Sequence, residues 1–137
     1  MVKKILIIGF GKVGKRYFSL LKNIKDIEII VCKKSVINSK NVKVIYNLKN
    51  TKEISGVIIA SPLNTHFRYA KFFLDKKIPV LLEKPVCKSF SQAEKLKNLS
   101  LKNKISLIIN YSDLFDVKLM QLIKLTSNEF NRIKEFS

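Results

Sequence analysis

Gly9-Phe10-Gly11-Lys12-Val13-Gly14 follows directly on the apolar run Lys4–Ile8 and opens a segment with helical spacing. Gly-x-Gly-x-x-Gly between a strand and a helix is typical of a tight phosphate-binding turn. The first glycine allows the turn, the second lets the backbone approach a pyrophosphate, and the third lets the helix pack closely on the strand. The six residues are therefore predicted to bind a dinucleotide, with a purely structural turn as the alternative.

The rest of the chain alternates short β-branched runs with longer helical patterns. Strands are expected at Lys4–Ile8, Ile27–Cys32, Val42–Tyr46, Gly56–Ala60, Ile78–Leu82 and Ile105–Asn110. These runs are nearly all apolar, as in parallel strands that are covered on both faces. With right-handed crossovers they predict a doubly wound parallel α/β sheet, a three-layer α/β/α Rossmann fold with strand order 3-2-1-4-5-6. A ligand is then expected at the carboxyl ends of the strands.

Helical spacing predicts which faces pack on this sheet. The first helix is expected to bury Val13, Tyr17, Leu20, Leu21 and Ile24, and the second Phe67, Ala70, Phe73 and Leu74. Ser91-Gln92-Ala93-Glu94 fits a capping box that opens a third helix with Ala93, Leu96 and Leu99 inside. Met120 and Ile123 suggest a last helix, while residues 50–54 form at most a turn or two.

Composition limits the class of protein. A chain of 137 residues and 15.8 kDa, 47% apolar and 27% charged, is typical of one soluble globular domain, and no apolar run is long enough to cross a membrane. Met1–Phe10 imitates a signal peptide, but its apolar stretch is short, so a cytoplasmic location is expected. Cys32 and Cys87 are expected to be small buried hydrophobes, and with His66 as the single histidine no metal site is expected.

The net charge of +17 raises the hypothesis of nucleic-acid binding. Of the 27 basic residues, however, only Arg16, Arg68 and Arg132 are arginines, the residue type that bidentate recognition of phosphates and bases favours. The lysines are scattered along the chain and accompany many Ile and Asn residues, which is typical of compositional drift. Nucleic-acid binding therefore stays a minor alternative.

The end of the second expected strand bears on the choice of cofactor. NAD-binding domains carry an acidic residue there that holds the ribose hydroxyls. Here the strand is followed by Lys33, Lys34 and Ser35, and Glu28 lies too early in it to serve. Two lysines and a hydroxyl would attract a 2′-phosphate, so NADP is favoured over NAD. The alternative is that these lysines reflect composition alone.

Two further segments resemble a known family. Ala60-Ser61-Pro62-Leu63-Asn64-Thr65-His66 follows the fourth expected strand, and Glu83-Lys84-Pro85 follows the fifth. With the glycine motif, their order and spacing resemble the three signatures of the Gfo/Idh/MocA oxidoreductases, the glucose-fructose oxidoreductase and inositol dehydrogenase family. The resemblance covers essentially residues 2–126, so residues 1–126 are expected to form an NAD(P)-binding domain.

The resemblance also implies roles for matching residues. Those that would line the cofactor pocket near the nicotinamide ribose are Ser61, Pro62, Asn64 and His66. Glu83 would help fix the cofactor or Lys84, and Lys84 would be the catalytic lysine that moves or orients a hydroxyl proton. The alternatives are a solvated surface lysine at position 84 and a locally capping histidine at position 66.

Departures from the family leave the function partly open. Members are well over twice this length and carry a second α/β domain with substrate contacts. The start of that domain is expected in the tail 127–137. In the family's segment after the last strand, Leu114 replaces an arginine. The favoured function is hydride transfer between nicotinamide and a hydroxyl carbon of a sugar, cyclitol or sugar-nucleotide. The alternatives are a non-catalytic dinucleotide-binding module, a cofactor sensor and a subunit completed by another chain. The partner expected besides the small-molecule substrate is a second copy of the chain or such a completing chain.

Overall fold

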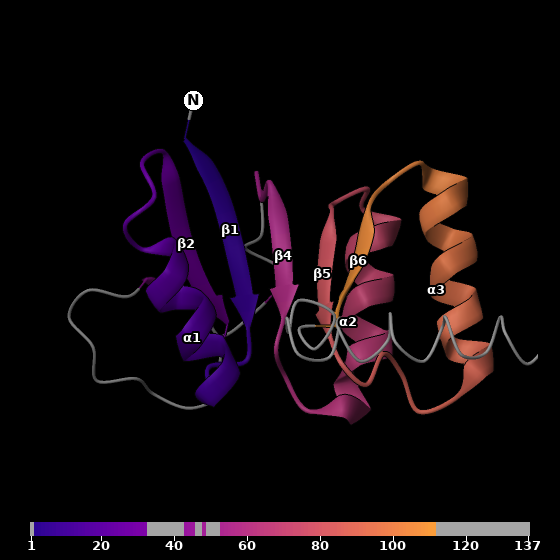
Figure 1. Ribbon diagram of the computed structural model, residues 1–137. Coiled ribbons are helices and arrows are strands. Elements are labelled where there is room, and N and C mark those ends of the chain that lie inside the picture. Colours follow the sequence, from indigo (N-terminus) through magenta and orange to yellow (C-terminus); the bar gives the residue numbers. More distant parts are fainter. Residues whose placement is uncertain (1, 33–42, 46–47, 49–52, 112–137) are drawn as a thin grey trace, which may run out of the picture.

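The structure, a computed structural model, describes residues 2–32, 43–45, 48 and 53–111. In this part of the chain three helices lie between strands, and β2, β3 and β4 follow one another directly in the element order (Figure 1). The strands are β1 (Lys3–Ile8), β2 (Ile27–Cys32), β3 (Lys43–Ile45), β4 (Gly56–Ile59), β5 (Val80–Glu83) and β6 (Leu107–Asn110). The helices are α1 (Lys12–Leu21), α2 (Leu63–Asp75) and α3 (Phe90–Asn103).

The strands form one parallel sheet in the order β3-β2-β1-β4-β5-β6. The central strand β1 pairs with β2 on one side and β4 on the other, so that Ile7 lies between Val31 and Ile58. The order reverses between β1 and β4. The predicted doubly wound sheet and its strand order are confirmed. Sheets of this kind bind ligands outside the carboxyl ends of the strands where the order reverses, which here are β1 and β4.

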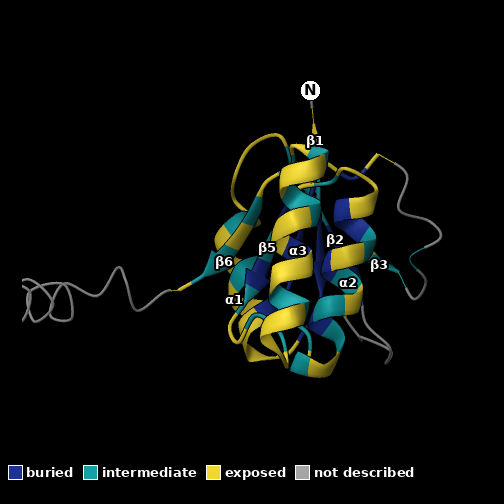
Figure 2. Cartoon of the chain, turned by 90° about the vertical axis from the view of Figure 1, so that its right-hand side faces the viewer, coloured by how far each residue is buried: buried dark blue, intermediate teal, exposed yellow. Residues whose placement is uncertain are grey.

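Each face of the sheet carries its own apolar cluster because side chains alternate along a strand. On one face Ile7, Val31 and Ile58 pack with Phe10 and with the inner side of α1. On the other face Leu6, Ile59 and Leu82 pack against α2 and α3. Figure 2 shows the helices with buried or half-buried stripes turned inward and exposed stripes turned outward. The three-layer α/β/α arrangement follows from these two clusters.

Helix α1 turns only part of the predicted face inward: Tyr17 and Leu21 pack on the sheet as expected, and the other three residues do not. Val13 and Leu20 are 41% and 62% exposed, and Ile24 lies beyond the helix and is 49% exposed. The inward side carries Gly14, which is buried, with Tyr17, Phe18 and Leu21, spaced at i, i+3, i+4 and i+7. The predicted face was shifted because apolar spacing omits Gly14, the buried residue of this helix, which has no side chain to count.

Helix α3 begins two residues earlier than predicted. Its N-cap is Ser89, whose Oγ accepts a hydrogen bond from the backbone N–H of Gln92 at 3.3 Å. The Gln92 side chain in turn accepts from the backbone N–H of Lys88 at 3.3 Å. The pattern Ser-x-x-Gln at 89–92 therefore forms the cap, and Ser91 lies within the first turn. The predicted inner face is confirmed, because Leu96 is buried and Leu99 packs on the same cluster.

Strand ends differ from the predictions by one or two residues: β5 and β6 begin at Val80 and Leu107. The predicted helix around Met120, the tail 127–137, and most of 50–54 lie outside the described residues. In the described part, no helix is long and apolar enough to cross a membrane.

Candidate functional site

The glycine turn joins β1 to α1 under tight steric limits at its two ends. Gly9 has φ +91°, and a Cβ there would lie 2.5 Å from the carbonyl oxygen of Ala60. A Cβ on Gly14 would lie 2.0 Å from the carbonyl oxygen of Gly9. Both positions need glycine for the fold itself, one for the turn and one for the close approach of helix and strand.

Gly11, between them, is different. An added Cβ at Gly11 would meet nothing within 4 Å, and its φ of −75° suits any residue. Gly11 is the N-cap of α1, it has no side chain to cap the helix, and the first turn carries no acidic residue. The N–H groups and the positive end of the helix dipole therefore lie next to open space, which is the arrangement that binds an anion.

The three sequence motifs meet around one small cavity. It has a volume of about 150 Å³ and lies at the carboxyl edge of the sheet. Its lining comes from the glycine motif and from the segments after β4 and β5: Val13, Ala60, Ser61, Leu63, His66, Glu83, Lys84 and Pro85. Segments widely separated in sequence thus line one cavity.

His66 holds two of these segments together. The ring lies in the first turn of α2 and is only 2% exposed. Its Nε2 is 2.8 Å from the carbonyl oxygen of Ser61, and its Nδ1 is 2.9 Å from the carbonyl oxygen of Pro85. Both partners are acceptors, so the neutral ring donates to one of them and the charged ring to both. His66 therefore joins the segment after β4 to the segment after β5.

Other predicted residues lie in different positions around the cavity. Ser61 lines it, and its hydroxyl pairs with that of Thr65 at 2.7 Å. Pro62 is the N-cap residue of α2, and Asn64 is exposed on that helix without lining the cavity. Phe10 packs in the core edge-to-face against Phe18, at 5.7 Å between ring centroids, so only its backbone can meet a ligand.

Lys84 is the first residue after β5, and it lines the cavity with Glu83 and Pro85. Its side chain is exposed, and the peptide bond between Lys84 and Pro85 is cis. Lys84 therefore lies beside the cavity, at the carboxyl edge of the sheet and open to solvent.

The carboxylate of Glu83 belongs to a hydrogen-bonded group of three side chains. The hydroxyl of Tyr17 donates to Oε1 of Glu83 at 2.5 Å. Nδ2 of Asn110 lies 2.7 Å from the same oxygen and 2.8 Å from the Tyr17 hydroxyl. Burial raises the pKa of Tyr17, and the hydrogen bond to Glu83 and the charge of Glu83 raise it further, so that this phenol stays a donor.

The end of β2 lies beside the glycine turn, because the N–H of Gly9 donates to the carbonyl oxygen of Cys32 at 3.1 Å. Lys33, Lys34 and Ser35, the predicted 2′-phosphate site, lie outside the described residues. The two cysteines pack against the core, and burial raises the pKa of each thiol.

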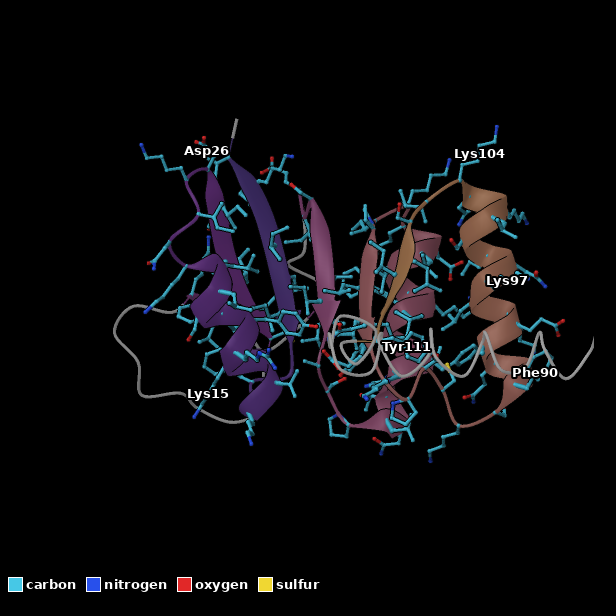
Figure 3. The ribbon with its side chains drawn as sticks, viewed as in Figure 1. Lys15, Asp26, Phe90, Lys97, Lys104 and Tyr111 are labelled. Atoms are coloured by element: carbon cyan, nitrogen blue, oxygen red, sulfur yellow. The ribbon has the colours of Figure 1, made fainter. Side chains whose placement is uncertain are left out.

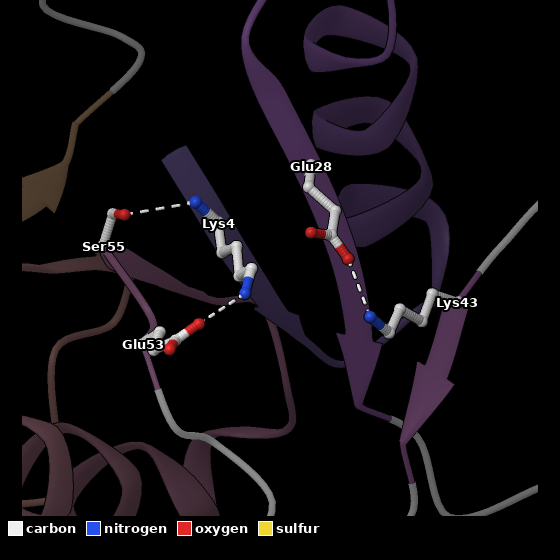
Figure 4. Close-up of polar contacts among 5 residues, drawn as sticks. All are labelled: Lys4, Glu28, Lys43, Glu53 and Ser55. Carbon is white, nitrogen blue, oxygen red and sulfur yellow. Dashed lines mark hydrogen bonds and ion pairs between the residues drawn. The ribbon is translucent and has the colours of Figure 1, made fainter. Parts of the chain in front are cut away.

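Glu28 lies at the opposite end of the sheet from the cavity. In Figure 4 its carboxylate accepts from Lys43 at 2.8 Å, while Lys4 pairs with Glu53 at 2.7 Å. The hydrogen bond from Lys43 lowers the pKa of Glu28. In the register of β1 and β2, Glu28 lies opposite Lys4, near the start of β2. This position is consistent with the prediction that Glu28 lies too early in the strand to hold a ribose.

A family comparison now identifies the domain. The family described as "Oxidoreductase family, NAD-binding Rossmann fold", GFO_IDH_MocA, matches residues 3–111, which include all three motifs. The chain belongs to the Gfo/Idh/MocA oxidoreductase family. The predicted family and its NAD-binding Rossmann domain are confirmed.

Several members and structures are similar to this Gfo/Idh/MocA chain. Glucose-6-phosphate 3-dehydrogenase of Bacillus subtilis (strain 168) is 29% identical over 96% of the chain and 40% of its own length. The structure of myo-inositol 2-dehydrogenase from Lactobacillus plantarum matches with TM-score 0.77 and 18% identity, over 93% of this chain and 42% of that one. Biliverdin reductase from Synechocystis sp. PCC 6803, in complex with biliverdin and NADP+, matches with TM-score 0.75 and 21% identity, over 82% and 39%. The chain thus spans about two fifths of the length of these relatives.

A larger cavity of this Gfo/Idh/MocA domain lies elsewhere. It has a volume of about 400 Å³ between α3 and β6, and Phe90, Leu101 and Leu107 are among its lining residues. None of its lining residues belongs to the three motifs, so it is not the candidate site.

Among the described residues no group of three His, Cys, Asp or Glu side chains could hold a metal ion. Lys15 on α1 and Lys97 and Lys104 at α3 lie apart on separate parts of the surface (Figure 3).

Sequence reasoning missed the polar roles of Tyr17 and Asn110. Tyr17 counted only toward an apolar helix face, and Asn110 only toward the end of a strand. Register brings them together, because Asn110 lies directly opposite Glu83 in the β5–β6 pairing. A polar residue at the end of each of two neighbouring strands is the signal that could have indicated the contact.

Proposed function

We propose that this chain holds a nicotinamide dinucleotide, NADP in preference to NAD, across the carboxyl edge of its sheet. We propose further that the protein transfers a hydride between this cofactor and a hydroxyl-bearing carbon. The observation that carries the proposal is the contrast among the glycines. Gly9 and Gly14 leave no room for a Cβ, whereas Gly11 has open space around it and no need of its own for glycine. A glycine that the fold does not require is explained by a ligand that approaches the backbone there.

The architecture suggests how the two halves of such a ligand lie. The pyrophosphate fits at the N-terminus of α1, where backbone N–H groups and the helix dipole favour negative charge. In a doubly wound sheet each half binds one nucleotide, so the adenosine belongs over β1 and β2 and the nicotinamide half over β4 to β6. The cavity lined by Ser61, Glu83 and Lys84 lies on the second side.

Lys84 is the residue proposed to handle the substrate proton. A nicotinamide cofactor, when bound, supplies the hydride chemistry. The Lys84 amine, beside the cavity at the end of β5, can orient a substrate hydroxyl or, when neutral, take its proton. His66 joins the carbonyl oxygen of Pro85, the residue after this lysine, to the segment after β4.

The substrate class is proposed from chemistry and from relatives. Glucose-6-phosphate 3-dehydrogenase and myo-inositol 2-dehydrogenase are named for polyhydroxylated ring substrates. A sugar, cyclitol or sugar-nucleotide is therefore the proposed substrate of the whole protein. The preference for NADP rests on the sequence Lys33-Lys34-Ser35, next after the strand end that contacts Gly9.

Titration of the purified chain with NADPH and NADH, followed by the change in nicotinamide fluorescence, tests the proposal. We expect saturable binding of both, and slow hydride transfer when NADP+ is mixed with glucose-6-phosphate or myo-inositol. Lys84→Met should lower the transfer rate by about 10²- to 10⁴-fold and leave cofactor affinity little changed. Failure to bind either dinucleotide would contradict the proposal, whereas binding without any transfer would contradict the part that assigns hydride transfer to this chain by itself and leave the dinucleotide site standing.

A further inference from the structure

The hydrogen-bonded group of Tyr17, Glu83 and Asn110 links three elements on one face of the sheet. Glu83 ends β5, Asn110 ends β6, and the two residues are paired across the strands. Leu81 lies two residues before Glu83, and it packs in the cluster under α1. The side chains of Glu83 and Asn110 therefore face the α1 side, where the Tyr17 hydroxyl meets both of them.

Both hydrogen bonds to the carboxylate end on one oxygen. Oε1 of Glu83 lies 2.5 Å from the Tyr17 hydroxyl and 2.7 Å from Nδ2 of Asn110. Two donors on a single oxygen fix the plane of the carboxylate, and hydrogen bonds to a charged group are among the strong ones. The second oxygen is then the one that can face a ligand, because Glu83 also lines the cavity.

Tyr17 lies on the helix whose N-terminus begins at the glycine turn. It is one turn beyond Val13, and Val13 lines the same cavity as Glu83. The helix that presents N–H groups to a pyrophosphate thus also holds a carboxylate on the nicotinamide side of the sheet.

We infer that Tyr17 and Asn110 are positioning residues that orient Glu83 so that its second oxygen accepts a hydrogen bond from the nicotinamide half of the cofactor. This inference rests on the proposed function. The nicotinamide carboxamide and its ribose both carry hydrogen-bond donors, whereas the ADP half is proposed to lie over β1 and β2, on the other side of the sheet from Glu83. Loss of Tyr17 or Asn110 therefore weakens binding of the whole dinucleotide but not of its adenosine half.

Comparison of two ligands in the Tyr17→Phe variant tests this. Phenylalanine keeps the aromatic ring packed against the apolar cluster between α1 and the sheet, and it removes only the hydroxyl. We expect the affinity for the dinucleotide that the parent binds more tightly to fall about three- to tenfold, measured by fluorescence titration. The affinity for the matching ligand that lacks both nicotinamide and its ribose, ADP or 2′-phospho-ADP, measured by calorimetry, should not change. A merely structural role would weaken both ligands together.

A double variant and a control sharpen the test. In a Glu83→Ala background the Tyr17 hydroxyl has no carboxylate to orient, so adding Tyr17→Phe should cause no further loss. Tyr69→Phe removes a surface hydroxyl that accepts from Arg68 on α2, and it should bind both ligands like the parent. Asn110→Ala provides the same comparison if Tyr17→Phe does not fold.

Three results would overturn the inference: unchanged dinucleotide affinity in Tyr17→Phe, an equal loss for both ligands, or a full additional loss in the Glu83→Ala background. If the parent chain binds neither ligand, the proposed function fails, and the inference fails with it. Measurements on the parent thus separate the two failures.

Discussion

Gly14 lies so close to Gly9 that a Cβ on Gly14 would be 2.0 Å from the carbonyl oxygen of Gly9. The first helix therefore starts in contact with the end of the first strand, and its backbone N–H groups are fixed at the carboxyl edge of the sheet. Gly11 belongs to the same turn, but a Cβ on Gly11 would meet no atom within 4 Å. In this motif the fold therefore requires glycine at positions 9 and 14, whereas at position 11 we propose that the ligand requires it.

Substitution of each glycine by alanine should separate these roles. Gly9→Ala and Gly14→Ala should each cost about 2 kcal/mol of unfolding free energy or more, because a methyl group meets backbone atoms that cannot move aside. Gly11→Ala should cost less than about 1 kcal/mol, the price of a poorer N-cap, and should still weaken dinucleotide binding. Urea unfolding and fluorescence titration measure the two effects. Gly56→Ala, whose Cβ would lie 3.5 Å from Ile5, is the control away from the site. Parent-like cofactor affinity in both Gly11→Ala and the bulkier Gly11→Val would contradict the placement of the pyrophosphate.

The cap of α3 can be located by a pair of serine substitutions. Ser89→Ala removes the oxygen that accepts from the N–H of Gln92, and it should destabilise the chain by about 1 kcal/mol. Ser91→Ala changes an exposed residue within the first turn and should stay within about 0.5 kcal/mol of the parent. Thermal and urea unfolding of the two variants give the comparison. A larger loss for Ser91→Ala would place the cap where the sequence pattern alone had put it.

Much of the fold could be predicted because its strands are buried on both faces. Runs such as Ile27–Cys32 are nearly all apolar, and the glycine motif fixes where the first strand ends and the first helix starts. Apolar spacing also predicted the inner face of α2, since Ala70, Phe73 and Leu74 are buried. These features are local, so they can be read from short stretches of sequence.

Features that depend on contacts between distant segments could not be predicted in this way. The face of α1 is decided by the contact of Gly14 with the glycine turn, and apolar counting omits that residue. Two overlapping Ser-x-x-Glu/Gln patterns fit the start of α3, and only the structure decides between them. Asn110 meets Tyr17 across 93 residues of sequence, because of strand order and register. The site motifs were found, whereas the side chains that support them were not.

Loss of the His66 ring should loosen the site and lower stability. His66→Leu leaves the carbonyl oxygens of Ser61 and Pro85 without their ring partner, and an unsatisfied polar group costs about 1–3 kcal/mol. Asn64→Ala, on the exposed side of the same helix turn, should stay within about 0.5 kcal/mol of the parent. Urea midpoints at constant slope give both values. Equal stability of the two variants would show that the ring does not join the two loops energetically.

Alkaline pH should reveal the environment of Tyr17. Burial, followed by the Glu83 hydrogen bond and charge, raises its pKa above the usual value of about 10. The folded chain then retains a proton that the unfolded chain loses, so this contribution to stability is complete below pH ~10 and is lost as pH rises further. The urea midpoint of the parent should therefore fall more steeply above pH ~10 than that of Tyr17→Phe. Lysine titration affects both chains alike, and Tyr69→Phe controls for loss of another tyrosine. Parallel curves for the parent and Tyr17→Phe would rule out the effect.

The preference for NADP over NAD is the prediction that reaches furthest beyond the described residues. The Gly9 N–H contacts the carbonyl of Cys32, so the chain leaves β2 beside the glycine turn, and the next residues in sequence are Lys33, Lys34 and Ser35. An aspartate at this point would accept from both ribose hydroxyls and repel a 2′-phosphate, whereas lysines attract the phosphate. We expect NADPH to bind roughly tenfold to a hundredfold more tightly than NADH.

The net charge of +17 by itself favours the more anionic cofactor, so the experiment must separate a local site from this background. Both cofactors are titrated at low and at near-physiological salt, in the parent, in Lys33→Asp, and in Lys76→Asp, which changes charge equally at the end of α2, away from the glycine turn. Screening acts strongly on the distant charges and weakly on a direct contact. A local site requires that the preference persist in salt, fall sharply in Lys33→Asp, and remain in Lys76→Asp. Equal affinities at physiological salt, or equal losses in the two variants, would mean that the lysines after β2 act only through the overall charge of the chain.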